Sequence, residues 1–328
     1  MGRGSGYMDT KRLIIDLAKC VGCFNCLAAC KDEFADNSWL PYTDRQKKHD
    51  QKWIDVQRHE RGAAPYTEVC YVPRLCNHCE NAECEKAFPD AVKRREDGIV
   101  LLDPDMAKGN KALADACPYG MISWNDELET TQKCTMCAHL LDGGWKEPRC
   151  VQACPLRAIS VVSCGDEEFA AMAAVQELAP LRSVAEAQEA AQLNSMVAEK
   201  GVAPAPGKAA GRAASREFAA LIPEESRPRV LYKNLHKYTD CFIAGALAYE
   251  ADGVEHAASG ALVKLNRGGE ILFSVETDFF GEFRIDRIPP NSGSYELSFY
   301  LDGFDPAELR VSVAGGSVCL DVIKLEKR

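Results

Sequence analysis

The C-terminal part of the chain alternates apolar and polar residues in short runs. Six runs can be distinguished, over residues 262–265, 271–275, 281–285, 295–299, 309–313 and 318–322. A period of two puts successive side chains on opposite faces of a strand, and the intervening Gly-, Asn- and Pro-rich segments are typical of turns. Short strands at such regular spacing predict a small antiparallel β-sandwich over residues 236–328.

Residues 166–235 have a different pattern, rich in alanine and glutamate. Acidic residues from Asp166 onward begin a short predicted helix, because negative charges stabilise a helix's first turn. A second helix is predicted over 184–199, and the Pro- and Gly-containing run 201–207 ends regular structure. The small, basic segment 208–215 favours a linker. We interpret residues 166–235 as a helical and linker segment between two domains.

Residues 1–165 show neither pattern over any length and hold most of the cysteines. The 328-residue chain has 16 cysteines, of which 14 lie between Cys20 and Cys164. So uneven a distribution excludes a uniformly disulfide-bonded chain. The composition is otherwise that of a folded protein, with 46% hydrophobic and 27% charged residues.

Charge, apolar run length and targeting signals indicate which partners and which cellular location to expect. The net charge of −10 argues against a general binder of nucleic acids or anionic membranes. The longest apolar runs, such as residues 242–248, fall short of the ~18 residues that read as a membrane-spanning helix. The N-terminal residues lack the apolar segment and twin arginine of export signals. We therefore expect a soluble protein, cytoplasmic by default, without nucleic acid or direct membrane insertion.

Four groups of cysteines carry the candidate chemistry. They are Cys20-x2-Cys23-x2-Cys26-x3-Cys30, Cys76-x2-Cys79-x4-Cys84, Cys117-Pro118, and Cys134-x2-Cys137-x12-Cys150-x3-Cys154-Pro155. Three thiolates from one tight loop can bind three irons of a [4Fe–4S] cubane, and in two-cluster ferredoxins a distant cysteine binds the fourth. The spacing therefore predicts a double ferredoxin-like iron–sulfur domain over residues 1–165, and an α+β protein as a whole.

A protein with four complete motifs of this kind would have 16 ligands and four clusters. Here four expected ligand positions hold other residues, namely Phe88, Ala107, Asn110 and Leu113. If the second and third motifs pair, these four are the whole ligand set of one cluster, and three sets remain. The predicted sets are Cys20, Cys23, Cys26 and Cys154; Cys134, Cys137, Cys150 and Cys30; and Cys76, Cys79, Cys84 and Cys117. Cys70 and Cys164 are left over as non-ligands.

Other chemistries for these cysteines are less favoured. Structural zinc also uses Cys-x2-Cys pairs, but zinc sites rarely take three cysteines from one loop, and zinc does not explain the Cys-Pro endings. A zinc-stabilised interaction module is nevertheless the alternative from another class, and a free-standing ferredoxin is a third. Since no dinucleotide fingerprint or nucleophile pattern is present, no catalytic residue is assigned.

The roles of several other residues remain open. His78, His139 and Lys133 lie beside expected ligands and would be placed to tune a cluster, but we interpret them as ordinary loop or surface residues. In the C-terminal region Cys241 and Cys319 are isolated in sequence and are interpreted as buried thiols. A disulfide between them stays open.

The motifs resemble the four-cluster ferredoxin subunits of the dimethyl sulfoxide reductase superfamily. The cysteine spacings and the segments 95–100, 116–120 and 132–137 carry this resemblance. Over nearly the whole chain, segments 58–62, 133–142, 228–235 and 277–283 are similar to the small subunits of pyrogallol–phloroglucinol transhydroxylases, to which catechol dehydroxylase small subunits are related. The alanine-rich residues 168–225 look expanded relative to that family.

The resemblance implies a function for the whole assembly. It implies a non-catalytic electron-transfer subunit with three [4Fe–4S] clusters, in a heterodimer or a multiple of it. The partner would be a large subunit that holds molybdenum bis-pterin guanine dinucleotide and acts on polyhydroxylated aromatics. Reductive catechol dehydroxylation and pyrogallol-type hydroxyl transfer are the expected reactions, and co-export with a signal-bearing partner stays open. The C-terminal sandwich resembles carboxypeptidase-regulatory-like and transthyretin-like domains.

Overall fold

The computed structural model describes residues 9–181 and 226–328, which form two compact units. The N-terminal unit comprises residues 9–58, 70–181 and 226–235 of the described chain. The C-terminal unit comprises residues 59–69 and 236–328. The predicted helix over 184–199 and the predicted linker after it lie outside the described residues.

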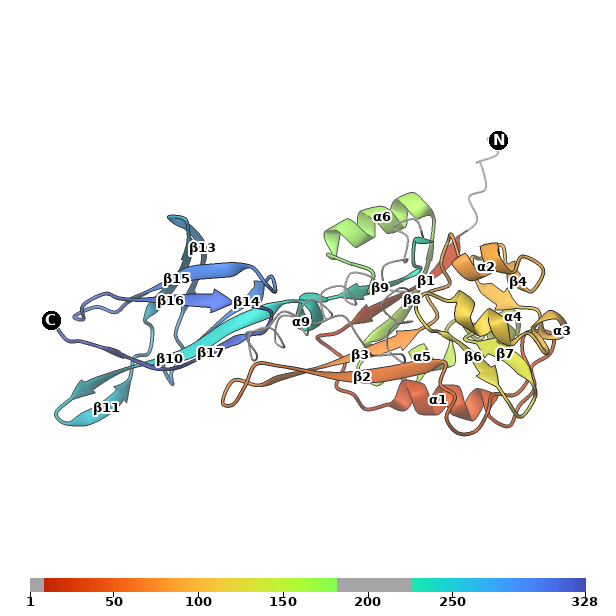
Figure 1. Cartoon of the computed structure of the whole chain (residues 1–328), viewed down its shortest axis with the longest axis horizontal. Coiled ribbons are helices and arrows are strands. Elements are labelled where there is room, and N and C mark those ends of the chain that lie inside the picture. The colour runs from red at the N-terminus through yellow and green to blue at the C-terminus, as the bar shows by residue number, and fades with distance from the viewer. Residues whose placement is uncertain (1–8, 182–225) are drawn as a thin grey trace, which may run out of the picture. The chain divides into compact units, whose positions relative to one another are not determined.

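A three-stranded sheet joins distant parts of the sequence in the N-terminal unit (Figure 1). Its strands are β8 (Ile159–Cys164), β1 (Thr10–Asp16) and β9 (Val230–Lys233), in that order. Strand β1 pairs antiparallel with β8 and parallel with β9. Leu13 and Ile15 in the central strand are fully buried. The segment predicted as helix and linker therefore ends in a strand that belongs to this sheet.

Short helices and hairpins carry the cysteine motifs. The helices are α1 (Asn25–Phe34), α2 (Glu83–Ala87), α3 (Pro104–Ala107), η1 (Lys111–Ala116, a 3-10 helix), α4 (Ala138–Asp142) and α5 (Arg149–Gln152). The hairpins pair β2 (Ile54–Arg61) with β3 (Glu68–Leu75), β4 (Val92–Arg94) with β5 (Val100–Leu102), and β6 (Ile122–Asn125) with β7 (Thr130–Lys133). Elements this short hold their geometry mainly through what they pack against.

Helix α6 (Asp166–Val175) begins at the residue that the acidic first turn indicates. Its buried Phe169 packs with Ile14 of β1 and Cys164 of β8. The guanidinium of Arg12 lies 4.5 Å from the centre of the Phe169 ring. The helix is thereby held on the three-stranded sheet.

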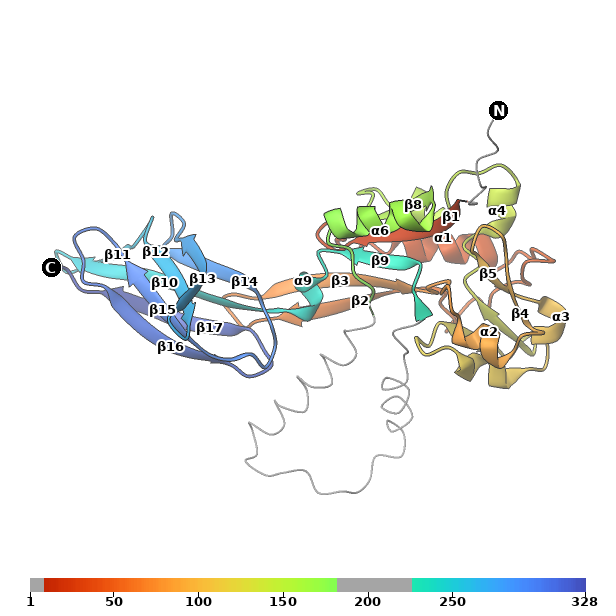
Figure 2. The same cartoon turned by 90° about the horizontal axis from the view of Figure 1, so that it is seen from above.

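The C-terminal unit has two four-stranded sheets and the short helix α9 (His236–Thr239), as Figure 2 shows from above. The first sheet has β11 (Val254–Ala257), β10 (Cys241–Ala251), β14 (Glu282–Ile288) and β17 (Val318–Leu325). The second has β13 (Glu270–Glu276), β12 (Leu262–Arg267), β15 (Gly293–Tyr300) and β16 (Ala307–Val313). Both sheets contribute to one hydrophobic core, with Ile243 from the first and Leu297 from the second fully buried.

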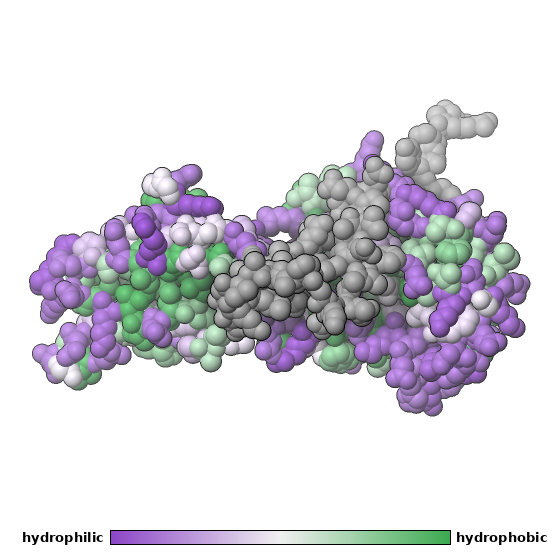
Figure 3. Space-filling model, in the orientation of Figure 1, coloured by the Kyte–Doolittle hydropathy of each residue, from purple (hydrophilic) through white to green (hydrophobic). Residues whose placement is uncertain are grey.

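All six strands predicted from period-two runs are present, but β10 and β11 were not predicted. Strand β10 is buried along most of its length, so its sequence is a continuous apolar run without alternation. Its pairing with β17 is parallel, whereas the sequence pattern predicts antiparallel strands. Figure 3 shows hydrophobic residues on the visible face of this unit, and Ile271 and Val322 are among its exposed apolar side chains.

Candidate iron–sulfur cluster sites

Twelve of the cysteines lie near one another in the N-terminal unit, and the predicted sets divide them into three groups of four. Thiols of one predicted set act electrostatically on one another, but Cys26 also acts on Cys150, and Cys76 on Cys134, across the predicted sets. Site 1 has Cys20, Cys23, Cys26 and Cys154; site 2 has Cys30, Cys134, Cys137 and Cys150; site 3 has Cys76, Cys79, Cys84 and Cys117. Members of each predicted set thus lie near one another, and the division into three ligand sets stays a prediction.

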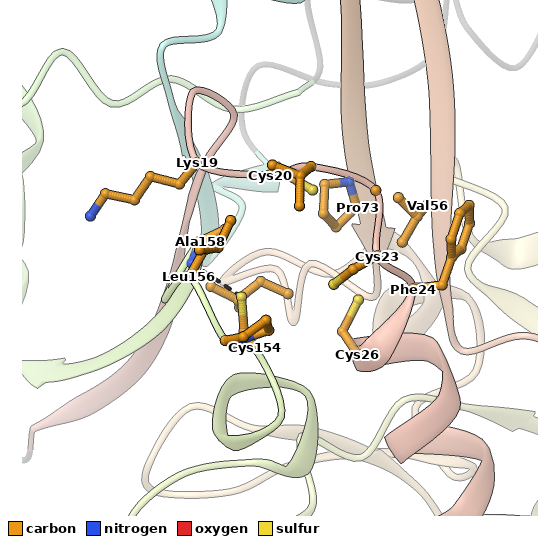
Figure 4. Close-up of a pocket in the computed structure, with 14 residues that line it drawn as sticks. Lys19, Cys20, Cys23, Phe24, Cys26, Val56, Pro73, Cys154, Leu156 and Ala158 are labelled. Carbon is orange, nitrogen blue, oxygen red and sulfur yellow. Dashed lines mark hydrogen bonds between the residues drawn. The ribbon is translucent and has the colours of Figure 1, made fainter.

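Site 1 lies at a loop that leads into α1. The sulfur atoms of Cys20, Cys23, Cys26 and Cys154 face one space in Figure 4. The backbone N–H of Ala158 donates to Cys154 Sγ over 3.1 Å. The loop is open to solvent, because Cys23 is exposed.

Gly22 fixes the course of the site 1 loop. Its φ is +68°, in the left-handed region that favours glycine. A Cβ at this position would lie 2.4 Å from the ring of Tyr71, on β3. A side chain at position 22 would therefore clash with β3, so the loop can take this course only with glycine there.

Site 2 is more enclosed than site 1. Cys30 lies on α1 and Cys150 on α5, and both are buried. Burial raises the pKa of the Cys137 thiol to about 12 and that of Cys134 to about 11. The backbone N–H of Met136 donates to Cys134 Sγ over 3.3 Å. Such N–H donors partly stabilise the thiolate that a metal requires.

Site 3 draws its cysteines from three neighbouring elements. Cys76 follows β3, Cys84 lies on α2, and Cys117 follows η1. The backbone N–H of Met121 donates to Cys117 Sγ over 3.4 Å. Burial raises the pKa of the Cys84 thiol to about 12. Binding of a cluster at site 2 or site 3 would therefore release protons from buried thiols.

The positions of the absent fourth ligand set are largely filled by apolar packing. Ala107 and Leu113 are 0% exposed and share a core with Cys84 of site 3, and Phe88 packs against that core. At the remaining position, the Asn110 carbonyl accepts a hydrogen bond from Thr131 Oγ1 over 2.7 Å. Hydrophobic side chains thus take the place of ligands here.

The four other cysteines are the ones that the spacing does not assign to a site. Cys70 and Cys164 are 3% and 4% exposed, on β3 and β8. Cys241 is buried in the core of the C-terminal unit. Cys319 accepts a hydrogen bond from the backbone N–H of Ala63 over 3.2 Å. None of the four forms a disulfide, so the disulfide left open between Cys241 and Cys319 is absent.

The side chains of three polar residues beside the cysteines are buried, so the expected surface position was wrong for His139 and Lys133, whereas His78 lies in a loop as expected but is buried there. His78 is 1% exposed and Lys133 is 2% exposed. The His139 side chain is 4% exposed, and its Nε2 lies 3.0 Å from Glu33 Oε1. In the sequence, only their position beside predicted ligand cysteines indicated a role at the sites. Their burial could not be predicted from the sequence, because polar side chains are usually exposed.

The donor chemistry of the three sites fits [4Fe–4S] clusters. Each site offers four cysteine sulfurs, which is the ligand set of a cubane. The buried Nε2 of His78, next to site 3, has no partner among the described residues, as expected beside a group that accepts hydrogen bonds. In the described part of the chain, no three His, Cys, Asp or Glu side chains are arranged to hold a single metal ion.

Comparison with known proteins places the chain in a family. Residues 67–164 match the 4Fe-4S dicluster domain. The chain is 36% identical to the pyrogallol hydroxytransferase small subunit of Pelobacter acidigallici, over 97% of this chain and 100% of that protein. It is 31% identical to the arsenate respiratory reductase iron-sulfur subunit of Shewanella sp. strain ANA-3, over 44% of this chain and 78% of that one. It is 36% identical to a probable anaerobic dimethyl sulfoxide reductase chain of Escherichia coli strain K12, over 44% of this chain and 69% of that one.

The fold, the cysteine sets and these matches define an iron–sulfur subunit of the kind found in oxidoreductase complexes. More narrowly, the chain belongs to the family of the pyrogallol hydroxytransferase small subunit. No helix among the described residues is long and apolar enough to cross a membrane.

Proposed function

We propose that this chain relays electrons through three [4Fe–4S] clusters to or from a molybdenum centre in a partner subunit, and holds no catalytic centre itself. The observation that supports the proposal is that the four cysteines of each predicted set lie near one another. The proposed ligands are Cys20, Cys23, Cys26 and Cys154 at site 1; Cys30, Cys134, Cys137 and Cys150 at site 2; and Cys76, Cys79, Cys84 and Cys117 at site 3. A [4Fe–4S] cluster accepts and donates one electron at a time.

Site 1 is the proposed point of electron exchange with the partner. Cys23 is exposed there, and the apolar side chains of Val21, Phe24 and Leu156 beside it are 59%, 44% and 48% exposed. Exposed apolar residues around a redox centre favour docking of another protein over free solvation. Sites 2 and 3 have more deeply buried thiols, which suits an internal relay.

The proposed division of the chain follows the same logic. Residues 1–165 form a polyferredoxin-type domain, residues 166–235 a helical and linker segment, and residues 236–328 a carboxypeptidase-regulatory-like β-sandwich. The two sheets that share one core in the C-terminal unit support the last part. The partner is a large molybdenum bis-pterin subunit, in a heterodimer or a multiple of it. The complex is cytoplasmic unless the partner brings an export signal.

The proposed substrates are polyhydroxylated aromatics. Reductive dehydroxylation replaces a phenolic hydroxyl by hydrogen and consumes two electrons and two protons, with release of water. Hydroxyl transfer is redox-neutral overall and needs no net supply of electrons. Three complete ligand sets favour the reaction with net electron flow, so catechol dehydroxylation is the first candidate and hydroxyl transfer the second.

An assay of the purified complex tests this function. The complex, copurified with its large subunit, is supplied with reduced viologen and a panel of catechols and pyrogallols. We expect viologen oxidation with at least one catechol. Hydroxyl transfer without viologen oxidation would support the second reaction instead. Purification of this chain without any molybdenum-containing partner would contradict the subunit role and favour a free-standing ferredoxin.

A further inference from the structure

A chain of hydrogen bonds runs between site 3 and site 2. The Val100 N–H donates to Nδ1 of His78, the residue between Cys76 and Cys79, over 3.1 Å. The ammonium of Lys133 donates to the Val100 carbonyl and, over 3.0 Å, to the Cys134 carbonyl. The backbone N–H and carbonyl of Val100 are thus hydrogen-bonded to His78 and Lys133, respectively. Each of these two residues is adjacent in sequence to a proposed cluster ligand.

The contact with Val100 fixes which ring nitrogen of His78 carries the proton. Because Nδ1 accepts the Val100 N–H, the proton of the neutral ring is on Nε2. A ring whose Nδ1 accepts a hydrogen bond carries its proton on the other nitrogen and is neutral. Nε2 is buried and has no partner among the described residues. A buried donor of this kind calls for an acceptor that belongs to the site.

Lys133 is a buried charge without a protein counter-ion among the described residues. It is 2% exposed, and its ammonium donates to two backbone carbonyls. No carboxylate in the described part of the chain forms an ion pair with it. The ammonium lies beside Cys134 of site 2 and is linked through Val100 to His78, which lies between two cysteines of site 3. A buried cation needs an anion close by.

The geometry points to His78 and Lys133 as the residues that set the redox potentials at sites 2 and 3. His78 donates its Nε2–H to a sulfur of the cluster at site 3, and Lys133 supplies a positive charge that both clusters share. Hydrogen-bond donors and positive charge favour the more negative, reduced cluster and so raise its potential. This inference rests on the proposed function, because it requires clusters at both sites.

Redox titration followed by electron paramagnetic resonance tests the assignment in the anaerobically purified complex. The signals are first assigned with one ligand variant per site. We expect His78→Leu to lower the midpoint potential at site 3 alone, and Lys133→Met to lower the potentials at sites 2 and 3. The potential at site 1 stays unchanged in both variants. His78→Gln, which keeps an acceptor and a donor, restores part of the shift.

Lys93→Met is the matched control, because Lys93 on β4 is exposed and donates to the Pro89 carbonyl. It should leave all three potentials unchanged. An unchanged site 3 potential in fully loaded His78→Leu, or an equal shift at all three sites, would overturn the inference. Iron and sulfide contents are measured in each sample. Their absence from the wild-type protein would defeat the proposed function itself, whereas full loading without a shift defeats this inference alone.

A second measurement covers the case in which the variants do not load. The wild-type complex is labelled with 15N-histidine, and pulsed electron paramagnetic resonance is recorded on the signal of site 3. We expect a hyperfine coupling from a histidine nitrogen. A site 3 signal without such a coupling would show that no His78 N–H contacts the cluster, whatever the variants do.

Discussion

At the scale of single residues, burial does not distinguish the proposed ligand cysteines from the other cysteines. Cys70 and Cys164 are 3% and 4% exposed, whereas Cys26 of site 1 is 8% exposed. The distinguishing property is the spacing in the sequence, because the ligands of a cubane come from one loop and a distant residue. The spacing therefore predicts the sets, but it contains no signal for the burial of His78 and Lys133.

Removal of one ligand should empty one site and leave the others. For Cys84→Ala we expect the iron content to fall by about a third, because a cubane needs its fourth ligand to be retained. Cys70→Ala is the control, since Cys70 is buried on β3 and is not a proposed ligand. Iron and acid-labile sulfide analysis measures both variants. An equal loss of iron in the two variants would refute the ligand assignment.

The carboxylate of Glu68 should make the C-terminal unit sensitive to acid. Burial alone would raise the pKa of Glu68, but hydrogen bonds from Lys237, Arg284 and Arg61 outweigh it and lower the pKa from 4.5 to about 2. Because the pKa of Glu68 is lower in the folded state, its carboxylate stabilises the fold at pH values above the pKa of the unfolded state. This stabilisation is lost as the pH falls from about 4.5 to about 2. The full effect is about 3 kcal/mol at most.

Glu68→Gln tests this ion-pair cluster in the full chain. We expect a lower calorimetric unfolding temperature for the C-terminal unit at pH 7, and a difference from wild type that shrinks as the pH falls below 4.5. Glu296→Gln is the control, because its pair with Arg310 is exposed and surface pairs contribute little. A difference from wild type that stays constant with pH would speak against the carboxylate as its cause.

At the scale of elements, the sequence pattern predicts strands that bury one face. It does not predict strands that are buried along most of their length or that pair with a distant segment. The runs that became β12 to β17 alternate because one face meets the core. Strand β10 lacks the alternation, and β9 pairs with β1, more than 200 residues earlier in the chain. Long-range pairing of this kind leaves no local pattern. The site 1 cysteine loop has a specific local requirement, because position 22 needs a residue without a side chain.

Gly22→Ala should damage site 1 selectively. The Cβ would meet the Tyr71 ring at 2.4 Å, in a left-handed conformation that alanine disfavours. We expect destabilisation of about 1–3 kcal/mol and loss of the site 1 signal, with sites 2 and 3 retained. Gly109→Ala is the matched control, because its φ is +70° but no atom lies within 4 Å of a Cβ there. Equal effects of the two variants would show that the close approach to Tyr71 is unimportant.

At the scale of the whole molecule, the sequence predicts the class of protein from the cysteine spacing and the family from extended similarity. The surface that meets a partner has no such signature, because exposed apolar residues such as Phe24 are also common on monomeric proteins. Only the structure shows that Phe24 lies beside an exposed cysteine set.

Phe24→Asp should weaken binding of the large subunit. Aspartate tolerates the left-handed φ of 60° at this position and places a charge in the apolar rim of site 1. We expect reduced copurification of the large subunit with an unchanged iron content. Val175→Asp is the control, because Val175 on α6 is 85% exposed and does not line site 1. Full retention of the partner by Phe24→Asp would exclude this rim as the interface.

The most direct test of three clusters is the metal and sulfide content of the chain. The protein is purified without oxygen, and iron, acid-labile sulfide and zinc are measured per chain. Three cubanes of four irons each predict about 12 iron and about 12 sulfide, with no stoichiometric zinc. Values near 8 or 16 would contradict the three ligand sets. Zinc without acid-labile sulfide would contradict the electron-transfer function altogether and favour a zinc-stabilised interaction module.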